Sequence, residues 1–143
     1  MKYYAAYGSN LNKEQMARRC PEAVPVCTAF LHRYELAFRR GYLTVDKKVG
    51  GSVPIGIWLI SDRDEKNLDH YEGYPKFYTK EEVSLEGNDG KKRTCMIYIM
   101  VSGHKKQPPT DGYFTTVYHG YREFGLDFDP LVEAYNNVKW PED

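Results

Sequence analysis

Two segments of alternating apolar and polar residues, separated by a short turn-forming run, constrain the fold of this chain more than any other feature. Residues Phe77–Leu85 and Thr94–Val101 alternate with the two-residue period of a half-buried strand. Between them lies Gly87-Asn88-Asp89-Gly90, whose residue types favour a reversal of the chain. The pattern predicts an antiparallel hairpin, and therefore a sheet that covers a core with one face.

Further strands and helices are mixed along the chain in an irregular order. The strands expected outside the hairpin are Lys2–Tyr7, Val24–Arg39 as one or two strands, the short piece Tyr42–Val45 between loops marked by Gly41, Gly50 and Gly51, and the buried run Pro54–Ile60. The helices expected are one from about Asn12 to about Cys20, one opened by Ser61 and its acidic followers and ended at Gly73, one over Tyr113–Phe124, and one with Asp129 as its cap running towards Trp140. Because the order lacks a regular β-α-β alternation, we expect one α+β domain over residues 1–143.

Charge, hydropathy and cysteine usage narrow the function classes. Twenty basic and twenty acidic residues give a net charge of +0, which argues against a nucleic-acid binder. No apolar run reaches the roughly 18–20 residues that span a bilayer, so no membrane partner is expected. The three cysteines lack a C-x-x-C spacing, and the scattered histidines suggest no metal site. Together with an N-terminus unlike a signal peptide, these features predict a cytoplasmic protein with reduced thiols.

The turn after the first strand, Tyr7-Gly8-Ser9-Asn10-Leu11, is the first candidate for chemistry. Consecutive backbone N–H groups in such a turn, with a helix start behind them, can bind a carboxylate. The same residue types also make an ordinary strand-to-helix turn. Both interpretations stay open on the residues alone.

Glu72 is the second candidate, at the end of the helix that Gly73 closes. Burial among its aromatic neighbours and the negative end of the helix dipole would both raise its pKa, as a proton carrier near neutral pH requires. A solvated glutamate at a frayed helix end is the alternative. A third stretch, from Pro108 to Leu126, offers tyrosines such as Tyr113 that either line a pocket or pack as one helix face.

Taken together, these motifs resemble those of the γ-glutamylcyclotransferase superfamily, including its AIG2-like members. Tyr7-Gly8-Ser9-Asn10-Leu11 resembles the family's opening signature, and Leu68-Asp69-His70-Tyr71-Glu72-Gly73 resembles the run that carries its catalytic glutamate. Tyr78 and Tyr113 match later family tyrosines, and Glu123-Phe124-Gly125-Leu126 resembles the family's late helix end, with Phe124 in place of tyrosine and Asp127 in place of proline. The resemblance covers about Tyr3 to Leu126.

The resemblance implies a small mixed, β-barrel-like sheet with flanking helices. It also implies an enzyme that releases 5-oxoproline from a small-molecule γ-glutamyl substrate without a cofactor or metal. Glu72 would be the catalytic acid/base, and Tyr7, Gly8, Ser9, Asn10, Leu11, Tyr78 and Tyr113 would bind the substrate. The leaving amine stays open among γ-glutamyl peptides, amino acids and amines, although Asn10 departs from the Tyr-Gly-Ser-Leu of the glutathione-degrading branch. Segments Arg39–Gly51 and Gly103–Gly112 are expected to recognise it.

Two other functions are compatible with the sequence. A non-catalytic domain of the same fold could bind a small carboxylate or a protein partner, because a fold does not guarantee an activity. A tyrosine-rich platform could stack single-stranded nucleic acid, but the balanced charge argues against the basic groove that such proteins add. The sequence specifies no oligomeric state.

Overall fold

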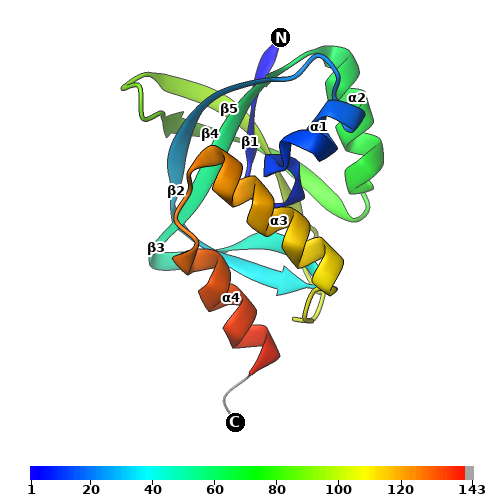
Figure 1. Ribbon diagram of the computed structural model, residues 1–143, viewed down its shortest axis with the longest axis vertical. Helices are drawn as coiled ribbons and strands as arrows, with labels where there is room; N and C mark the ends of the chain where they lie inside the picture. The colour runs from blue at the N-terminus through cyan, green and yellow to red at the C-terminus, as the bar shows by residue number, and fades with distance from the viewer. Residues whose placement is uncertain (141–143) are drawn as a thin grey trace.

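A five-stranded mixed sheet organises the molecule, with strand order β2-β3-β1-β5-β4 (Figure 1). A computed structural model describes residues 1–140, so the last three residues of the domain predicted over 1–143 lie outside the described residues. The strands are β1 (Lys2–Ala6), β2 (Val24–Arg39), β3 (Tyr42–Ile60), β4 (Tyr78–Glu86) and β5 (Lys92–Met100). All neighbours pair antiparallel except β1 and β5, which pair parallel.

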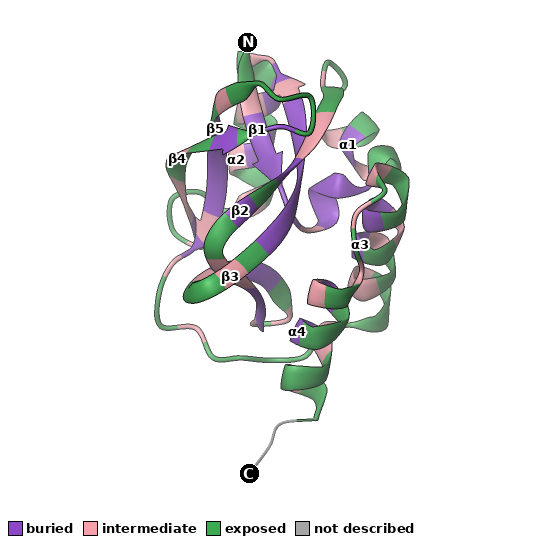
Figure 2. Ribbon diagram, turned by 90° about the vertical axis from the view of Figure 1, so that its left-hand side faces the viewer, coloured by how far each residue is buried: buried purple, intermediate pink, exposed green. Residues whose placement is uncertain are grey.

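Helices cover the sheet and the ends of its strands. They are the short 3-10 helix η1 (Ser9–Leu11), α1 (Lys13–Arg19), α2 (Asp62–Glu72), α3 (Asp111–Phe124) and α4 (Asp129–Lys139). In Figure 2, α1, α3 and α4 lie along one side of the sheet, and the buried stretches of the strands face them. The core contains Ile55 and Ile57 of β3, Ile97 of β5 and Val117 of α3, all fully buried. The predicted α+β class is therefore confirmed.

The sheet curls so that its edges approach each other, as the barrel-like prediction implied. The amide of Asn88, in the β4–β5 turn, donates to the Thr28 carbonyl of β2 at 2.8 Å, and the Thr28 amide donates back to Asn88 Oδ1 at 3.2 Å. These two hydrogen bonds join the far strand pair to the opposite edge strand of the same sheet.

The hairpin predicted from Phe77–Leu85 and Thr94–Val101 is confirmed as β4 and β5, paired from Tyr78↔Met100 to Glu86↔Lys92. The helix ends at Gly73 and Gly125 are confirmed as well, since both residues adopt the left-handed conformation that closes a helix. Over residues 1–140, no helix is both long enough and apolar enough to cross a membrane.

Two local predictions are wrong. Gly50 and Gly51 do not separate two strands: β3 runs through them, and residues 48–51 lie between paired positions where β2 has only Arg33. Asp129 does not cap α4, because Phe128 occupies the cap position and Asp129 is the first helical residue. The amide of Asp129 instead donates a hydrogen bond to Asp127 Oδ1 at 3.0 Å.

Candidate active site

The turn after β1 is held by partners from β3 and α3. Trp58 Nε1 of β3 donates to the Asn10 carbonyl at 3.0 Å, and Asn12 Nδ2 donates to the Thr116 carbonyl of α3 at 3.0 Å. The Tyr121 hydroxyl of α3 donates to the Tyr7 carbonyl at 2.8 Å. These bonds fix the backbone of the turn against the sheet and the longest helix, so the turn presents a defined surface.

Glu72 is the last residue of α2. The helix begins with a capping box between Ser61 and Asp64, buries Leu68 against the core, and ends where Gly73 turns left-handed at a φ of 65°. This placement directs Glu72 towards the turn: Asn10 Nδ2 donates to Glu72 Oε1 at 3.0 Å. The two candidate segments predicted from the sequence therefore contact each other through the side chains of Asn10 and Glu72.

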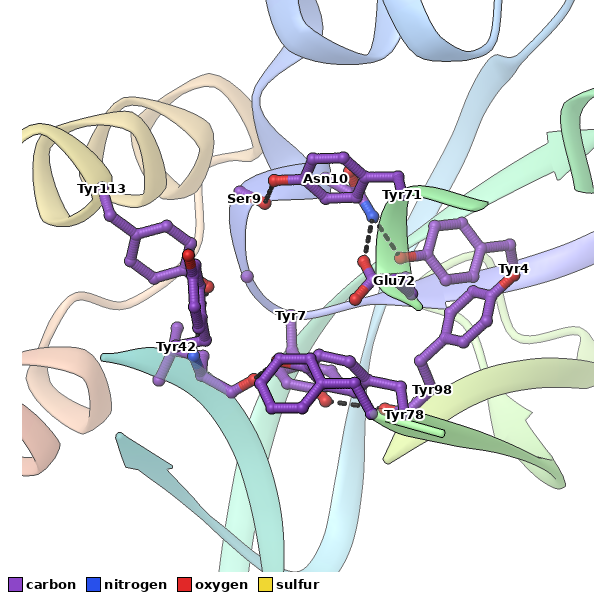
Figure 3. A pocket seen from close by; sticks show the side chains of 13 residues that line it. Tyr4, Tyr7, Ser9, Asn10, Tyr42, Tyr71, Glu72, Tyr78, Tyr98 and Tyr113 are labelled. Carbon is purple, nitrogen blue, oxygen red and sulfur yellow. Dashed lines mark hydrogen bonds between the residues drawn. The ribbon is translucent and has the colours of Figure 1, made fainter. Parts of the chain in front are cut away.

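A cavity of about 230 Å³ lies where these segments meet. Figure 3 shows Glu72 hydrogen-bonded to Asn10 at one side of the cavity, with tyrosine rings arranged around the open space. Tyr42 and Tyr71 are 45% and 43% exposed, so the cavity opens to solvent beside them. The lining residues are Tyr4, Tyr7, Gly8, Ser9, Asn10, Tyr42, Leu43, Tyr71, Glu72, Phe77, Tyr78, Tyr98 and Tyr113.

The tyrosine hydroxyls of the cavity fall into two hydrogen-bonding roles. Tyr7 donates to the Tyr98 carbonyl at 2.6 Å and Tyr78 donates to the Leu43 carbonyl at 2.7 Å, so each leaves only oxygen lone pairs for a ligand. The Tyr113 hydroxyl instead accepts from the Leu43 amide at 3.1 Å and keeps its own hydrogen to donate. The cavity therefore offers both acceptors and a donor.

Backbone donors supplement Tyr113. In the described part of the chain, residues 1–140, no protein acceptor pairs with the amides of Gly8, Ser9 and Asn10, whereas the Leu11 amide donates to the Gly8 carbonyl at 3.0 Å. Because Gly8, Ser9 and Asn10 line the cavity, their amides remain available for an anionic or carbonyl oxygen.

Burial governs the electrostatics of Glu72. Loss of solvent raises the pKa of Glu72 to about 7, against the opposing effects of the Asn10 hydrogen bond and the positive charge of Arg19. The same burial raises the pKa of Tyr4, Tyr7 and Tyr78 well above the usual phenol range, so these tyrosines stay neutral while Glu72 titrates. A carboxyl group with such a pKa can both accept and release a proton near neutral pH.

Most of the residues singled out from the sequence lie together. Tyr7, Gly8, Ser9, Asn10, Glu72, Tyr78 and Tyr113 line the cavity. Leu11 does not: its side chain is fully buried and its amide is used within the 3-10 turn. Within residues 1–140, no group of three or more His, Cys, Asp or Glu side chains is arranged to hold a metal ion.

Sequence reasoning missed several residues of the site. Tyr4 and Tyr98 face the cavity from neighbouring strands, and Tyr42, Tyr71 and Phe77 form its open side. Tyr4, Tyr42 and Tyr98 belong to strands, and alternation in a sequence does not distinguish a strand face that meets a core from one that lines a cavity. The position of Tyr71 directly before Glu72 was the one available signal.

Comparisons with known proteins agree with this geometry. The family described as "Gamma-glutamyl cyclotransferase, AIG2-like" matches residues 4–116. A protein of Mus musculus named gamma-glutamylcyclotransferase is 30% identical over 135 residues, which cover 86% of this chain and 71% of the relative. The protein of the same name from Homo sapiens is 30% identical over 138 residues, 88% of this chain and 73% of the relative.

A solved structure named gamma-glutamyl cyclotransferase superposes with a TM-score of 0.82 at 27% identity, covering 99% of this chain and 88% of that structure. The match spans the sheet and all the helices described above. It thus includes both segments that build the cavity. By sequence and by fold, this chain belongs to the γ-glutamylcyclotransferase, AIG2-like family.

Proposed function

We propose that this protein catalyses the intramolecular aminolysis of a γ-glutamyl compound, releasing 5-oxoproline and a free amine, with Glu72 as the proton carrier. The observation that supports it most directly is the pairing of a half-buried carboxyl group, whose pKa is about 7, with unpaired backbone amides across one cavity. Membership of a family with relatives named γ-glutamylcyclotransferase supports the same reaction.

The hydrogen-bond donors and the acceptors of the cavity suit different groups of a γ-glutamyl substrate. The amides of Gly8, Ser9 and Asn10 would receive the α-carboxylate and the oxygen of the reacting carbonyl. The Tyr7 and Tyr78 oxygens, which can only accept, suit the α-ammonium group. The Tyr113 hydroxyl would donate to a substrate oxygen. Leu11 would act only by shaping the turn.

The reaction closes a five-membered ring. Glu72 in its ionised form removes a proton from the α-ammonium group, and the freed amine attacks the γ-carbonyl carbon to form the new C–N bond. The bond to the departing nitrogen then breaks as that nitrogen is protonated by Glu72. Glu72, ionised again, then takes the second proton from the ring nitrogen and passes it to the departing amine, so that two protons in all move between the two nitrogens and the amine leaves as an ammonium ion.

The substrate supplies its own nucleophile, so this chemistry requires correct folding of the substrate and no cofactor. The departing amine would leave on the open side of the cavity, past Tyr42 and Phe77. Tyr42 lies within the segment Arg39–Gly51, and His104 of the segment Gly103–Gly112 packs on the Phe77 ring at 5.3 Å. Both segments expected to recognise the leaving amine therefore reach this side.

The substitution Glu72→Gln tests the proposal, because it keeps the shape of the side chain and removes the proton carrier. We expect turnover to fall by at least ~10²-fold, the lower end for general acid–base catalysis, with the fold intact. The measurement is direct detection of 5-oxoproline from a panel of γ-glutamyl peptides, amino acids and amines.

Glu82→Gln is the matched control, since Glu82 is exposed on β4. It should leave turnover unchanged. Equal turnover by the wild-type protein and Glu72→Gln would refute the role of Glu72. Binding of γ-glutamyl compounds by the wild-type protein without any 5-oxoproline would mean a non-catalytic binding domain.

A further inference from the structure

The Asn10 side chain hydrogen-bonds both to Glu72 and to Arg19, a cation outside the cavity. Its side chain is almost fully buried, and its amide nitrogen donates both to Glu72 Oε1 at 3.0 Å and to the Tyr4 hydroxyl oxygen at 2.8 Å. Its amide oxygen accepts from Arg19 Nη1 at 2.7 Å. Arg19 belongs to the last turn of α1 and does not line the cavity.

The chemistry of these groups allows only one orientation of the amide. A guanidinium group has donors and no acceptor, so Arg19 must face the oxygen of Asn10. The NH₂ group of Asn10 then necessarily faces Glu72 and donates to it. The reverse orientation would place two oxygens against each other at Glu72 unless that carboxyl group were protonated.

Arg19 is itself held in place on three sides. Its guanidinium lies over the Tyr71 ring, 3.4 Å from the ring centre, and Nη2 donates to Gln15 Oε1 at 2.6 Å. Its carbonyl accepts from Asn67 Nδ2 of α2 at 2.9 Å. A planar guanidinium stacked on an aromatic ring is well suited to hold one fixed hydrogen-bonding direction.

We propose that Arg19 is a positioning residue, which fixes the Asn10 amide so that its NH₂ group holds the ionised form of Glu72 ready to accept a proton. The inference deepens the proposed function and rests on it for the use of that proton. Arg19 touches no substrate in this account and acts only through Asn10 and through its charge.

The other groups facing Glu72 do not replace this effect. They are phenols whose pKa is raised by burial, and they stay neutral as Glu72 titrates: Tyr4 and Tyr7 at β1, Tyr78 on β4, Tyr98 on β5 and Tyr113 on α3. Asp69, on the same helix as Glu72, is bonded to Tyr98 at 2.6 Å and to Lys80 at 3.0 Å. Among residues 1–140, Arg19 is the cation that lowers the pKa of Glu72.

Arg19→Met tests the inference by removing the charge and the donor while keeping the length of the side chain. The pKa of Glu72 should then rise, and the acidic limb of the kcat/KM profile should move up by about 1 pH unit. The activities should converge at higher pH, where Glu72 is ionised in both proteins. Arg19→Lys keeps a charge and a donor, so its acidic limb should lie close to that of the wild-type protein.

Arg18→Met is the matched control, because Arg18 is the neighbouring arginine and pairs on the surface with Glu14 at 2.7 Å. It should leave the profile unchanged. A loss of activity that is equal at every pH, or a profile unmoved in Arg19→Met, would overturn the positioning role.

Carbon-13 NMR of the Glu72 carboxyl group separates this inference from the proposed function. The spectrum follows the titration directly in each protein, with Glu72→Gln to identify the resonance. A shifted midpoint in a protein that makes no 5-oxoproline would keep the inference and reject the reaction. An unshifted midpoint in an active enzyme would do the reverse.

Should Arg19→Met not fold, the Asn10 NH₂ resonances of the wild-type protein must follow the Glu72 titration, and their constancy with pH would overturn the inference.

Discussion

At the residue scale, the site depends on a carboxyl group kept where it is costly to ionise. The tyrosines around Glu72 stay neutral near pH 7. The cation that lowers its pKa, Arg19, is linked to it through the Asn10 side chain. Its pKa of about 7 is useful for proton transfer and unfavourable for folding, because the unfolded chain ionises the same group more easily. Function and stability should therefore oppose each other at this position.

The pH dependence of stability follows from that shift. Below pH ~4, Glu72 is protonated in both the folded and the unfolded chain, and it causes no loss of stability. Between pH ~4 and 7 the unfolded chain ionises Glu72 while the folded chain keeps it protonated, so the folded state loses up to about 3 kcal/mol, and the loss levels off above pH 7. Glu72→Gln should thus be more stable than the wild-type protein at pH 8 and equal to it at pH 4. Urea unfolding at both pH values measures this, and a difference that is the same at both would contradict the raised pKa.

At the element scale, the turn after β1 depends on the close approach of α3. A Cβ atom on Gly120 would lie 2.7 Å from the Asn12 nitrogen and 2.7 Å from the Leu11 carbonyl carbon, both backbone atoms. Backbone cannot move aside as a side chain can, so the helix or the turn would have to shift. The position of the turn after β1 accordingly depends on the packing of α3, a helix far along the chain.

Gly120→Ala tests this packing. Alanine usually favours a helix over glycine, but here we expect a loss of about 1–3 kcal/mol of stability from overpacking, together with reduced turnover as the turn moves. Gly112→Ala in the same helix is the control, because a Cβ there meets nothing within 4 Å. Urea unfolding and 5-oxoproline release measure both variants. Equal behaviour of the two variants would show that the close approach does not position the turn.

Some elements were predictable from the sequence and others were not, for physical reasons. The β4–β5 hairpin and the end of α2 were correct because alternation and a glycine cap are local signals. The interruption expected at Gly50 and Gly51 became a bulge inside β3. Gly51 allows the Tyr34 carbonyl to come so close that a Cβ would lie 2.3 Å from its oxygen, and that contact depends on the pairing with β2.

At the scale of the whole molecule, the fold brings together a turn near the start of the chain and the end of a helix in its middle. The resemblance to a family predicted that Glu72 and the turn at residues 7–11 belong to one site. It did not predict Arg19 or Tyr4, because their roles depend on how α1 and β1 meet Asn10. Such contacts follow from packing across the sheet, which no local pattern in the sequence records.

The most direct test of the account is a crystal structure of the protein with 5-oxoproline bound. We expect the carboxylate of the ligand to accept hydrogen bonds from the amides of Gly8, Ser9 and Asn10. The Glu72 side chain should lie within hydrogen-bond distance of the ring nitrogen. A ligand bound elsewhere, or one in this cavity with Glu72 turned away into solvent, would contradict the proposed reaction.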